Sequence, residues 1–180
     1  MAITATDILF KLSVVAAAGN TTAGTPATSL GDQISTTQIT DATLNNLFDD
    51  VSGDENAASD VEYRCIFVHN AHATLTWQSV VVWLSAEVAD GANAAMAIDD
   101  LAASPIGQES AQADVIADEN TAPGAGVGAF SSPTTKGTGL SLGNIAAGSC
   151  RAIWIKRTAA NTVAVDNDGV TIRCEGDTAA

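Results

Sequence analysis

The chain has 180 residues, a formal net charge of −14 with only seven lysines and arginines, and 46% apolar residues. This length is sufficient for one domain with its own hydrophobic core. Affinity for nucleic acid and for anionic lipid comes mainly from lysine and arginine, so the charge argues against a nucleic-acid-binding or membrane-surface protein. No apolar run approaches the about 20 residues that a membrane span needs.

Residues 1–57 are rich in Thr, Gly, Ser and Asp, and we expect them to form an extended N-terminal arm. Within them, "ILFKLSVV" alternates, which predicts a strand with Ile8, Phe10, Leu12 and Val14 on one side. The stretch "VVAAAG" resembles a signal-peptide cleavage region. Because Asp7 stands where positive charge is expected and Lys11 interrupts the apolar run, we expect cytosolic synthesis without a signal.

The segment "TDATLNNLFDDVSG" leaves two interpretations open. Leu44, Leu47, Phe48 and Val51 follow helical spacing, so that Thr40 would cap a short helix and Gly53 would end it. The alternative is an irregular loop with apolar anchors. The nearby acidic run "DDVSGDE" (Asp49, Asp50, Asp54 and Glu55) is better explained as a solvated loop than as a divalent-cation site.

Residues 58–180 are expected to form a β-sandwich, interrupted at residues 85–139 by a long insertion of loops and short strands. The strands are predicted at "VEYRCIFVHN", "ATLTWQSVVVWLS", "GSCRAIWIKRT" and "GVTIRCEG", and "DNDG" before the last one predicts a turn. In the insertion, "AMAIDDL", "ADVIADE" and "VGAFSS" are candidate short strands that cover the sandwich or a neighbouring molecule. The predicted core consists of Phe67, Trp77, Val80, Val82, Trp83, Ile153, Trp154, Ile155, Val170 and Ile172.

Cys65, His69 and His72 lie close together in sequence and raise the question of a metal or catalytic site. In a strand, Cys65 and His69 share a face but lie about 13 Å apart at about 3.3 Å per residue, and the turn "NAHA" leaves His72 exposed at its tip. The pattern therefore favours strand, turn and strand over a zinc site. Cys65, Cys150 and Cys174 are expected to be reduced and buried.

No other motif indicates chemistry. "DNDG" lacks the glutamate that a calcium loop would place further along, and "GAGVG" neither follows a clear strand nor opens a helix, so a phosphate loop is not supported. There is no nucleophile motif of the G-x-S-x-G type. We therefore expect a protein that is not an enzyme and has no metal and no cofactor.

The pair "VHNAHATLTWQSVVVWLS" and "LSLGNIAAGSCRAIWIKRT" resembles an immunoglobulin-like sandwich, with a jelly roll as the related possibility. The serial order of "SLGDQIST", "NNLFDDVSGDE", "EYRCIFVHN", "IADENTAP", "LSLGNIAAG", "AIWIKRT" and "VTIRCEGD" resembles virion structural proteins of tailed bacteriophages over most of the chain. Within that class, the chain's acidic charge most resembles that of capsid decoration, or cement, proteins. Tail, neck and baseplate proteins share such sandwiches and remain an alternative.

This resemblance implies a β-sandwich made in the host cytoplasm and bound to the outer surface of a phage head. Its partners would be the major capsid protein and copies of itself, often as a homotrimer. The candidate partner-binding residues are Ile8, Phe10, Leu12, Val14 and Leu30 of the arm, which would make an apolar contact that moderate salt leaves intact. A third possibility, a host- or carbohydrate-binding module, would require an exposed tryptophan on a flat face.

Overall fold

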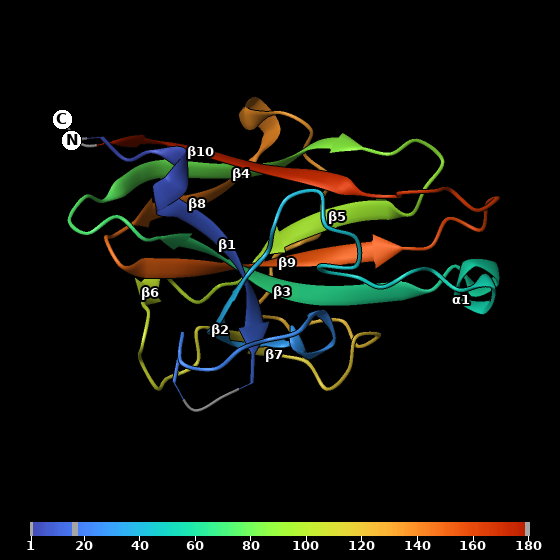
Figure 1. Ribbon diagram of the computed structural model, residues 1–180, viewed down its shortest axis with the longest axis horizontal. Coiled ribbons are helices and arrows are strands. Elements are labelled where there is room, and N and C mark those ends of the chain that lie inside the picture. Colours follow the sequence, from blue (N-terminus) through green and yellow to red (C-terminus); the bar gives the residue numbers. More distant parts are fainter. Residues whose placement is uncertain (1, 16–17, 179–180) are drawn as a thin grey trace.

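The computed structural model describes residues 2–15 and 18–178 and is nearly all β. Sheet A has seven strands in the order β5-β9-β3-β1-β2-β7, with β6 also paired to β9, and sheet B has the order β10-β4-β8. All pairs are antiparallel. Figure 1 shows β10 and β4 lying over β9 and β3, which confirms the predicted all-β sandwich.

The strands are β1 (Ile8–Val14), β2 (Gly31–Gln38), β3 (Val61–Asn70), β4 (Trp77–Glu87), β5 (Asn93–Ile98), β6 (Ser104–Pro105), β7 (Ala113–Val115), β8 (Leu140–Ile145), β9 (Ser149–Thr158) and β10 (Val170–Thr178). The helices are α1 (Gly53–Ala58) and the 3-10 turns η1 (Ala5–Asp7), η2 (Pro26–Thr28) and η3 (Lys136–Thr138). In the described ranges, none of these helices is long and apolar enough to cross a membrane. Some predictions fall on residues outside the described ranges: Ala16 and Ala17 of the cleavage-like stretch, residue 1 of the predicted arm and residue 180 of the predicted sandwich.

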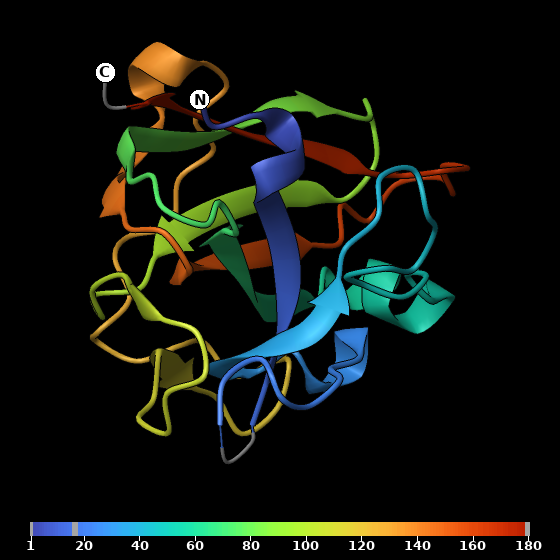
Figure 2. The same cartoon turned by 60° about the vertical axis from the view of Figure 1, so that its left-hand side comes forward.

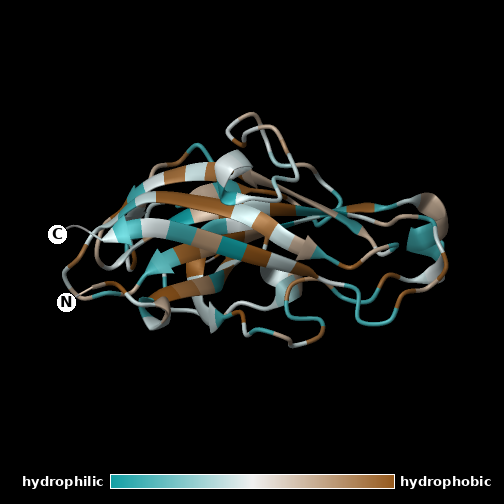
Figure 3. Ribbon diagram, turned by 90° about the horizontal axis from the view of Figure 1, so that it is seen from above, coloured by the Kyte–Doolittle hydropathy of each residue, from teal (hydrophilic) through white to brown (hydrophobic). Residues whose placement is uncertain are grey.

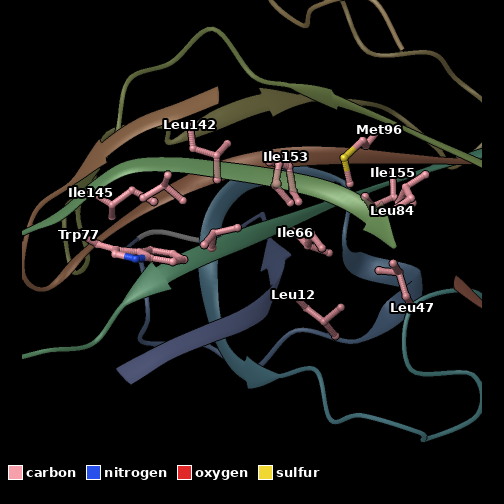
Figure 4. Packing of buried hydrophobic residues seen from close by; sticks show 13 residues of the cluster. Leu12, Leu47, Ile66, Trp77, Leu84, Met96, Leu142, Ile145, Ile153 and Ile155 are labelled. Atoms are coloured by element: carbon pink, nitrogen blue, oxygen red, sulfur yellow. The ribbon is translucent and has the colours of Figure 1, made fainter. Parts of the chain in front are cut away.

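The main core fills the space between the two sheets. Trp77, Val80 and Val82 of β4 face Ile153 and Ile155 of β9, and all five side chains are buried (Figure 4). On β10, Val170 and Ile172 are half-buried and pack against the same cluster. Strands that face water on their other side alternate in hydropathy, as the strand ending at the C-terminus does in Figure 3.

A second core covers the opposite face of sheet A. Cys65 and Phe67 of β3 and Trp154 of β9 point into it and pack against Ala113 and Ile116 of the insertion. In Figure 2 the loops between β5 and β8 and the loop after β1 lie on the side of sheet A away from sheet B. Because sheet A is buried on both faces, its strands β3 and β9 are apolar runs without clear alternation. Trp83 is also buried, outside both clusters.

The predicted extended arm is wrong for the described part of residues 1–57. Strand β1 lies inside sheet A, with Lys11 opposite Gln38 of β2 on one side and opposite Phe67 of β3 on the other. Leu12 and Val14 are buried. The polar composition was misleading because buried polar groups of β2 bond to other parts of the chain: Gln33 Nε2 donates to the Glu109 carbonyl oxygen at 2.8 Å, although Gln33 Oε1 has no partner.

The segment between β2 and α1 is an irregular loop, as the second of the two interpretations expected. Leu47 is buried in the main core and Phe48 packs against it, whereas Leu44 is 66% exposed. Gly53 begins the helix α1 and does not end one, because Ser52 provides the N-cap: its hydroxyl accepts from the Glu55 amide at 3.3 Å.

The insertion, residues 85–139, is part of the sandwich. Its strand β5 pairs with β9, and its strand β7 pairs with β2 at Gly31. Gly31 has φ +103°, and a Cβ there would lie 1.7 Å from the Asp114 carbonyl oxygen, so only glycine fits this close approach of β2 to β7. The "VGAFSS" stretch forms isolated bridges in place of a full strand: Ser131 pairs with Met96 of β5, and Val127 pairs with Asp99 just after β5.

Candidate functional site

The five predicted partner-binding residues do not gather on a free surface. Leu12 and Val14 are buried, and Ile8 and Phe10 are half-buried against the main core. Leu30 packs against the second core, on the other side of sheet A. These side chains are therefore used for packing within the chain, and they are not available as anchors for a neighbouring molecule.

The structure places His69 as predicted, within β3 on the same face as Cys65, but corrects the prediction for His72. His72 is 9% exposed, because its ring takes the place of a backbone acceptor in the turn. Its Nδ1 accepts hydrogen bonds from the Thr74 amide at 3.1 Å and the Leu75 amide at 3.0 Å. Asn70 completes the turn by donating to the carbonyl oxygens of Leu75 at 2.9 Å and Ile145 at 3.0 Å. The segment is a hydrogen-bonded turn between strands.

A group of ionisable and thiol side chains lies buried around His69. Neither ring nitrogen of His69 has a hydrogen-bond partner, and burial together with the Lys11 charge lowers its pKa to about 4. Lys11 donates to the Asn20 side-chain oxygen at 2.6 Å, and burial lowers its pKa as well. Cys150, opposite His69 on β9, accepts from Gln112 Nε2 at 3.1 Å.

The thiols of this region are poor nucleophiles and poor metal ligands at neutral pH. Burial raises the pKa of Cys150 to about 12 and that of Cys65 well above its ordinary value. Burial also raises the pKa of Cys174 to about 12. Since a thiol must be ionised to attack or to bind a metal, these cysteines act as small packing side chains. Cys65 and Cys150 are buried as expected, whereas Cys174 is half-buried against the main core.

Within the described ranges, one group of three side chains has ligand atoms close enough to hold a metal ion: Asp99, Asp100 and Asp114, with one oxygen of each within 4.8 Å of the others. Asp99 and Asp100 directly follow β5, Asp114 lies in β7, and the backbone of Gly126 passes close to Asp100 and Asp114. A Cβ on Gly126 would lie 2.8 Å from Asp114 Oδ2. Burial, and then the charges of Asp99 and Asp100, raise the pKa of Asp114.

The burial of Asp99 is explained by hydrogen bonds within the protein. Its Oδ2 accepts from Trp154 Nε1 at 3.0 Å and from the Asp114 amide at 2.9 Å, and its Oδ1 accepts from the Leu101 amide at 3.0 Å. Asp99 thus holds the second core in register with the loop that covers it. Sequence reasoning found no signal for this cluster, because Asp99 and Asp100 follow β5 and Asp114 lies in β7, and these two segments come together only in the folded chain.

The acidic runs that the sequence did single out have structural roles. The Glu55 side chain accepts from the Ser52 amide at 2.6 Å, Asp49 pairs with Arg157, and Asp168 of "DNDG" accepts from the Ala92 amide at 2.6 Å. These contacts stabilise the N-terminus of α1 and two loops.

At the α1 end of the molecule, two arginines enclose Phe48. The guanidinium carbon of Arg64 lies 5.3 Å from the Phe48 ring centroid and that of Arg157 lies 4.8 Å from it. Arg64 pairs with Glu119, and Arg157 pairs with Glu62. A pocket of about 290 Å³ opens beside Arg64 between the 25–27 turn and Asn45. Arg64, which lines this pocket, and Arg157 beside it both have carboxylate partners, so the charges at this end are used to join loops to β3 and β9.

The three tryptophans lie inside the protein. Trp77 is 5% exposed, Trp83 7% and Trp154 0%. A carbohydrate-binding platform formed by a tryptophan face is therefore absent from the part of the chain that the structure describes.

No protein-family model, no curated protein and no solved structure matches this chain.

Proposed function

We propose that this chain is a non-enzymatic virion structural protein, a decoration protein that binds and stabilises the outer shell of a phage head. The observation that carries the proposal is the serial order of seven segments, from "SLGDQIST" to "VTIRCEGD", on an all-β sandwich. The charge of −14 supports an outer position, because packaged DNA repels such a chain.

The way in which the chain would contact the shell differs from the arm contact that the sequence suggested. With Leu12 and Val14 buried in sheet A, the apolar anchors are not free. Among the described residues, the large exposed apolar side chains come from different loops and strand ends: Val15, Leu44, Val88, Leu101, Val115 and Val163. The folded acidic surface is therefore the part that would meet the shell, against a basic patch of the major capsid protein.

Heat treatment of particles with and without this protein tests the proposal. A protein that binds only the assembled shell stabilises the shell by mass action. We expect particles that lack it to assemble and then to lose DNA at a lower temperature, and purified protein added back to restore the higher temperature. An unrelated acidic protein added in its place controls for a general effect of charge.

Equal heat stability with and without the protein would contradict the decoration function. An electron-microscopy map of the virion separates the remaining possibilities: density for this chain on the tail, neck or baseplate would assign it to the alternative class. The host- or carbohydrate-binding module would require an exposed tryptophan, and all three tryptophans are buried.

A further inference from the structure

Strand β10 forms an edge of sheet B. It has nine residues, Val170 to Thr178, and among the described residues it pairs with β4 and with no second strand. In Figure 1 it lies at the outside of the upper layer. A long edge strand carries a row of unpaired backbone N–H and C=O groups, which can pair with a strand of another chain.

The charges on β10 and on the η3 side chain that pairs with it are balanced, unlike those of the whole chain. Its exposed side chains are Thr171, Arg173, Glu175 and Asp177. Lys136 of η3 pairs with Glu175. Two cations and two anions thus lie together in a protein with seven cations and a net charge of −14. A second copy of the chain can approach here without the repulsion that the acidic surface imposes elsewhere.

We propose that β10 pairs with β10 of a second copy, antiparallel, about a twofold axis at Cys174. In this register Arg173 lies opposite Glu175 of the other copy, and Glu175 lies opposite its Arg173. Two opposite-charge cross-strand pairs form from one strand sequence, which is the self-complementary pattern that a twofold interface requires.

Neighbouring registers are disfavoured by the same side chains. If the twofold axis lay between two residues, exposed side chains of one copy would be opposite core-facing side chains of the other. The alternative registers are therefore those with the axis at another residue of β10. An axis at Arg173 would place two arginines opposite each other. An axis at Glu175 would place two glutamates opposite each other, which offsets part of the gain from the two Arg173–Asp177 pairs that this register would form. Like charges directly opposite destabilise a strand pair.

The core-facing side of β10 fits the same register. Ile172 comes opposite Gly176 of the other copy, a large side chain next to a position without one. Gly176 itself is required for packing, since a Cβ there would lie 2.8 Å from Trp77 Nε1. The two paired strands would join sheet B of both copies into one continuous sheet. The resulting assembly is a dimer, not the trimer that the family resemblance implies, and it does not depend on the proposed function.

Charge exchange on β10 tests both the interface and its register. Sedimentation velocity over a concentration series, at an ionic strength of about 0.15 M where long-range repulsion is screened, measures dimerisation of the wild type, Arg173→Glu, Glu175→Arg and the double variant. We expect the wild type to dimerise. Each single variant should weaken the dimer about tenfold, because both cross-strand pairs become like-charged. The double variant should restore it.

Two further proteins serve as controls. Glu109→Arg makes the same charge change at an exposed site far along the chain and should leave dimerisation unchanged. Lys136→Ala removes the ion pair within one copy, so it shows whether loss of that pair alone explains Glu175→Arg. Hydrogen exchange of the wild type at low and high concentration gives a readout without substitution: β10 amides should become protected as the dimer forms.

A wild type that stays monomeric throughout the series would overturn the proposal, and so would β10 amides with the same exchange at both concentrations. A dimer that both single variants leave intact would assign the interface to another surface. A dimer that the double variant fails to restore would overturn the register. A trimer would contradict the twofold axis.

Discussion

His69 and His72 show that residues three positions apart can have opposite roles. Both are buried, but His72 accepts two backbone hydrogen bonds and His69 accepts none. A buried polar group without a partner costs stability, whereas one that satisfies backbone donors supplies it. One histidine is therefore a structural part of the turn and the other is a weak point of β3.

We predict that the wild type loses stability as the pH falls into the mildly acidic range, and that His69→Leu does not show this loss. The pKa of His69 is about 4 in the folded chain and about 6.5 when unfolded, so the unfolded state takes up the proton first. Stability is fully present above pH 6.5 and falls as the pH drops towards 4, by up to about 3 kcal/mol. Urea unfolding of the wild type and His69→Leu between pH 7 and pH 4 measures the difference.

His72→Ala is the matched control for this experiment. It should cost about 1–3 kcal/mol already at pH 7, because the amides of Thr74 and Leu75 lose their acceptor. Equal slopes of stability against pH in the wild type and His69→Leu would show that His69 is not the titrating group.

The acidic cluster gives a second pair of variants with opposite expected effects. Asp99→Asn places an amide group among three N–H donors and should destabilise the protein by about 2 kcal/mol. Asp114→Asn removes a carboxylate whose pKa is raised by burial and by its neighbours, and should stabilise it by about 0.5 kcal/mol at pH 7. Thermal unfolding of the wild type and both variants at pH 7 measures these changes in stability. A stabilising Asp99→Asn would contradict the role assigned to that side chain.

Among the elements, β1 is the one whose observed role differs most from the role predicted from the sequence. The alternation of Ile8, Phe10 and Leu12 predicted the strand itself. Its position inside sheet A depends on pairing with β2 and β3, and no local pattern encodes a partner that follows after a long loop.

We predict that β1 is essential for folding. Leu12→Ala should destabilise the protein by about 2–4 kcal/mol, because Leu12 is 2% exposed in the main core. Leu44→Ala, at a position that is 66% exposed, should change stability by less than about 0.5 kcal/mol. Deletion of residues 1–38 should give an unfolded chain. If circular dichroism showed that the deletion product is folded, the N-terminal segment would be dispensable for folding, as the predicted arm would be.

The sequence was sufficient for the strands with strong apolar patterns and insufficient for the others. The segments that became β1, β3, β4, β9 and β10 were predicted, as was the burial of the three tryptophans and of Ile153 and Ile155. The candidate strands "AMAIDDL" and "ADVIADE" overlap β5 and β7. β2 was missed because "GDQISTTQ" is polar, and its burial depends on hydrogen bonds to distant residues such as Gln112. The Asp99, Asp100 and Asp114 cluster was missed because its members come from two separate segments of the insertion, whose approach depends on the tertiary fold.

For the whole molecule, the acidic surface leads to a prediction about salt. If the proposed contact joins this surface to a basic patch of the shell, moderate salt should release the protein from virions while the shell stays whole, because exposed charge pairs are screened. Sedimentation of particles after incubation at increasing salt, with the supernatant assayed for this chain, measures the release. Retention at high salt would indicate an apolar contact and a surface other than the one proposed.

The strand order of sheet A also has a consequence for how the chain folds. β3 ends at Asn70, and its partner β9 begins only at Ser149, so the centre of the sheet requires closure of a very long loop. Such distant pairings make folding slow, on the scale of milliseconds to seconds or longer. During synthesis, the apolar β3 emerges from the ribosome well before β9 exists. Until then its free edge can pair with another nascent chain, so the newly made protein has its greatest need of a chaperone before β9 emerges.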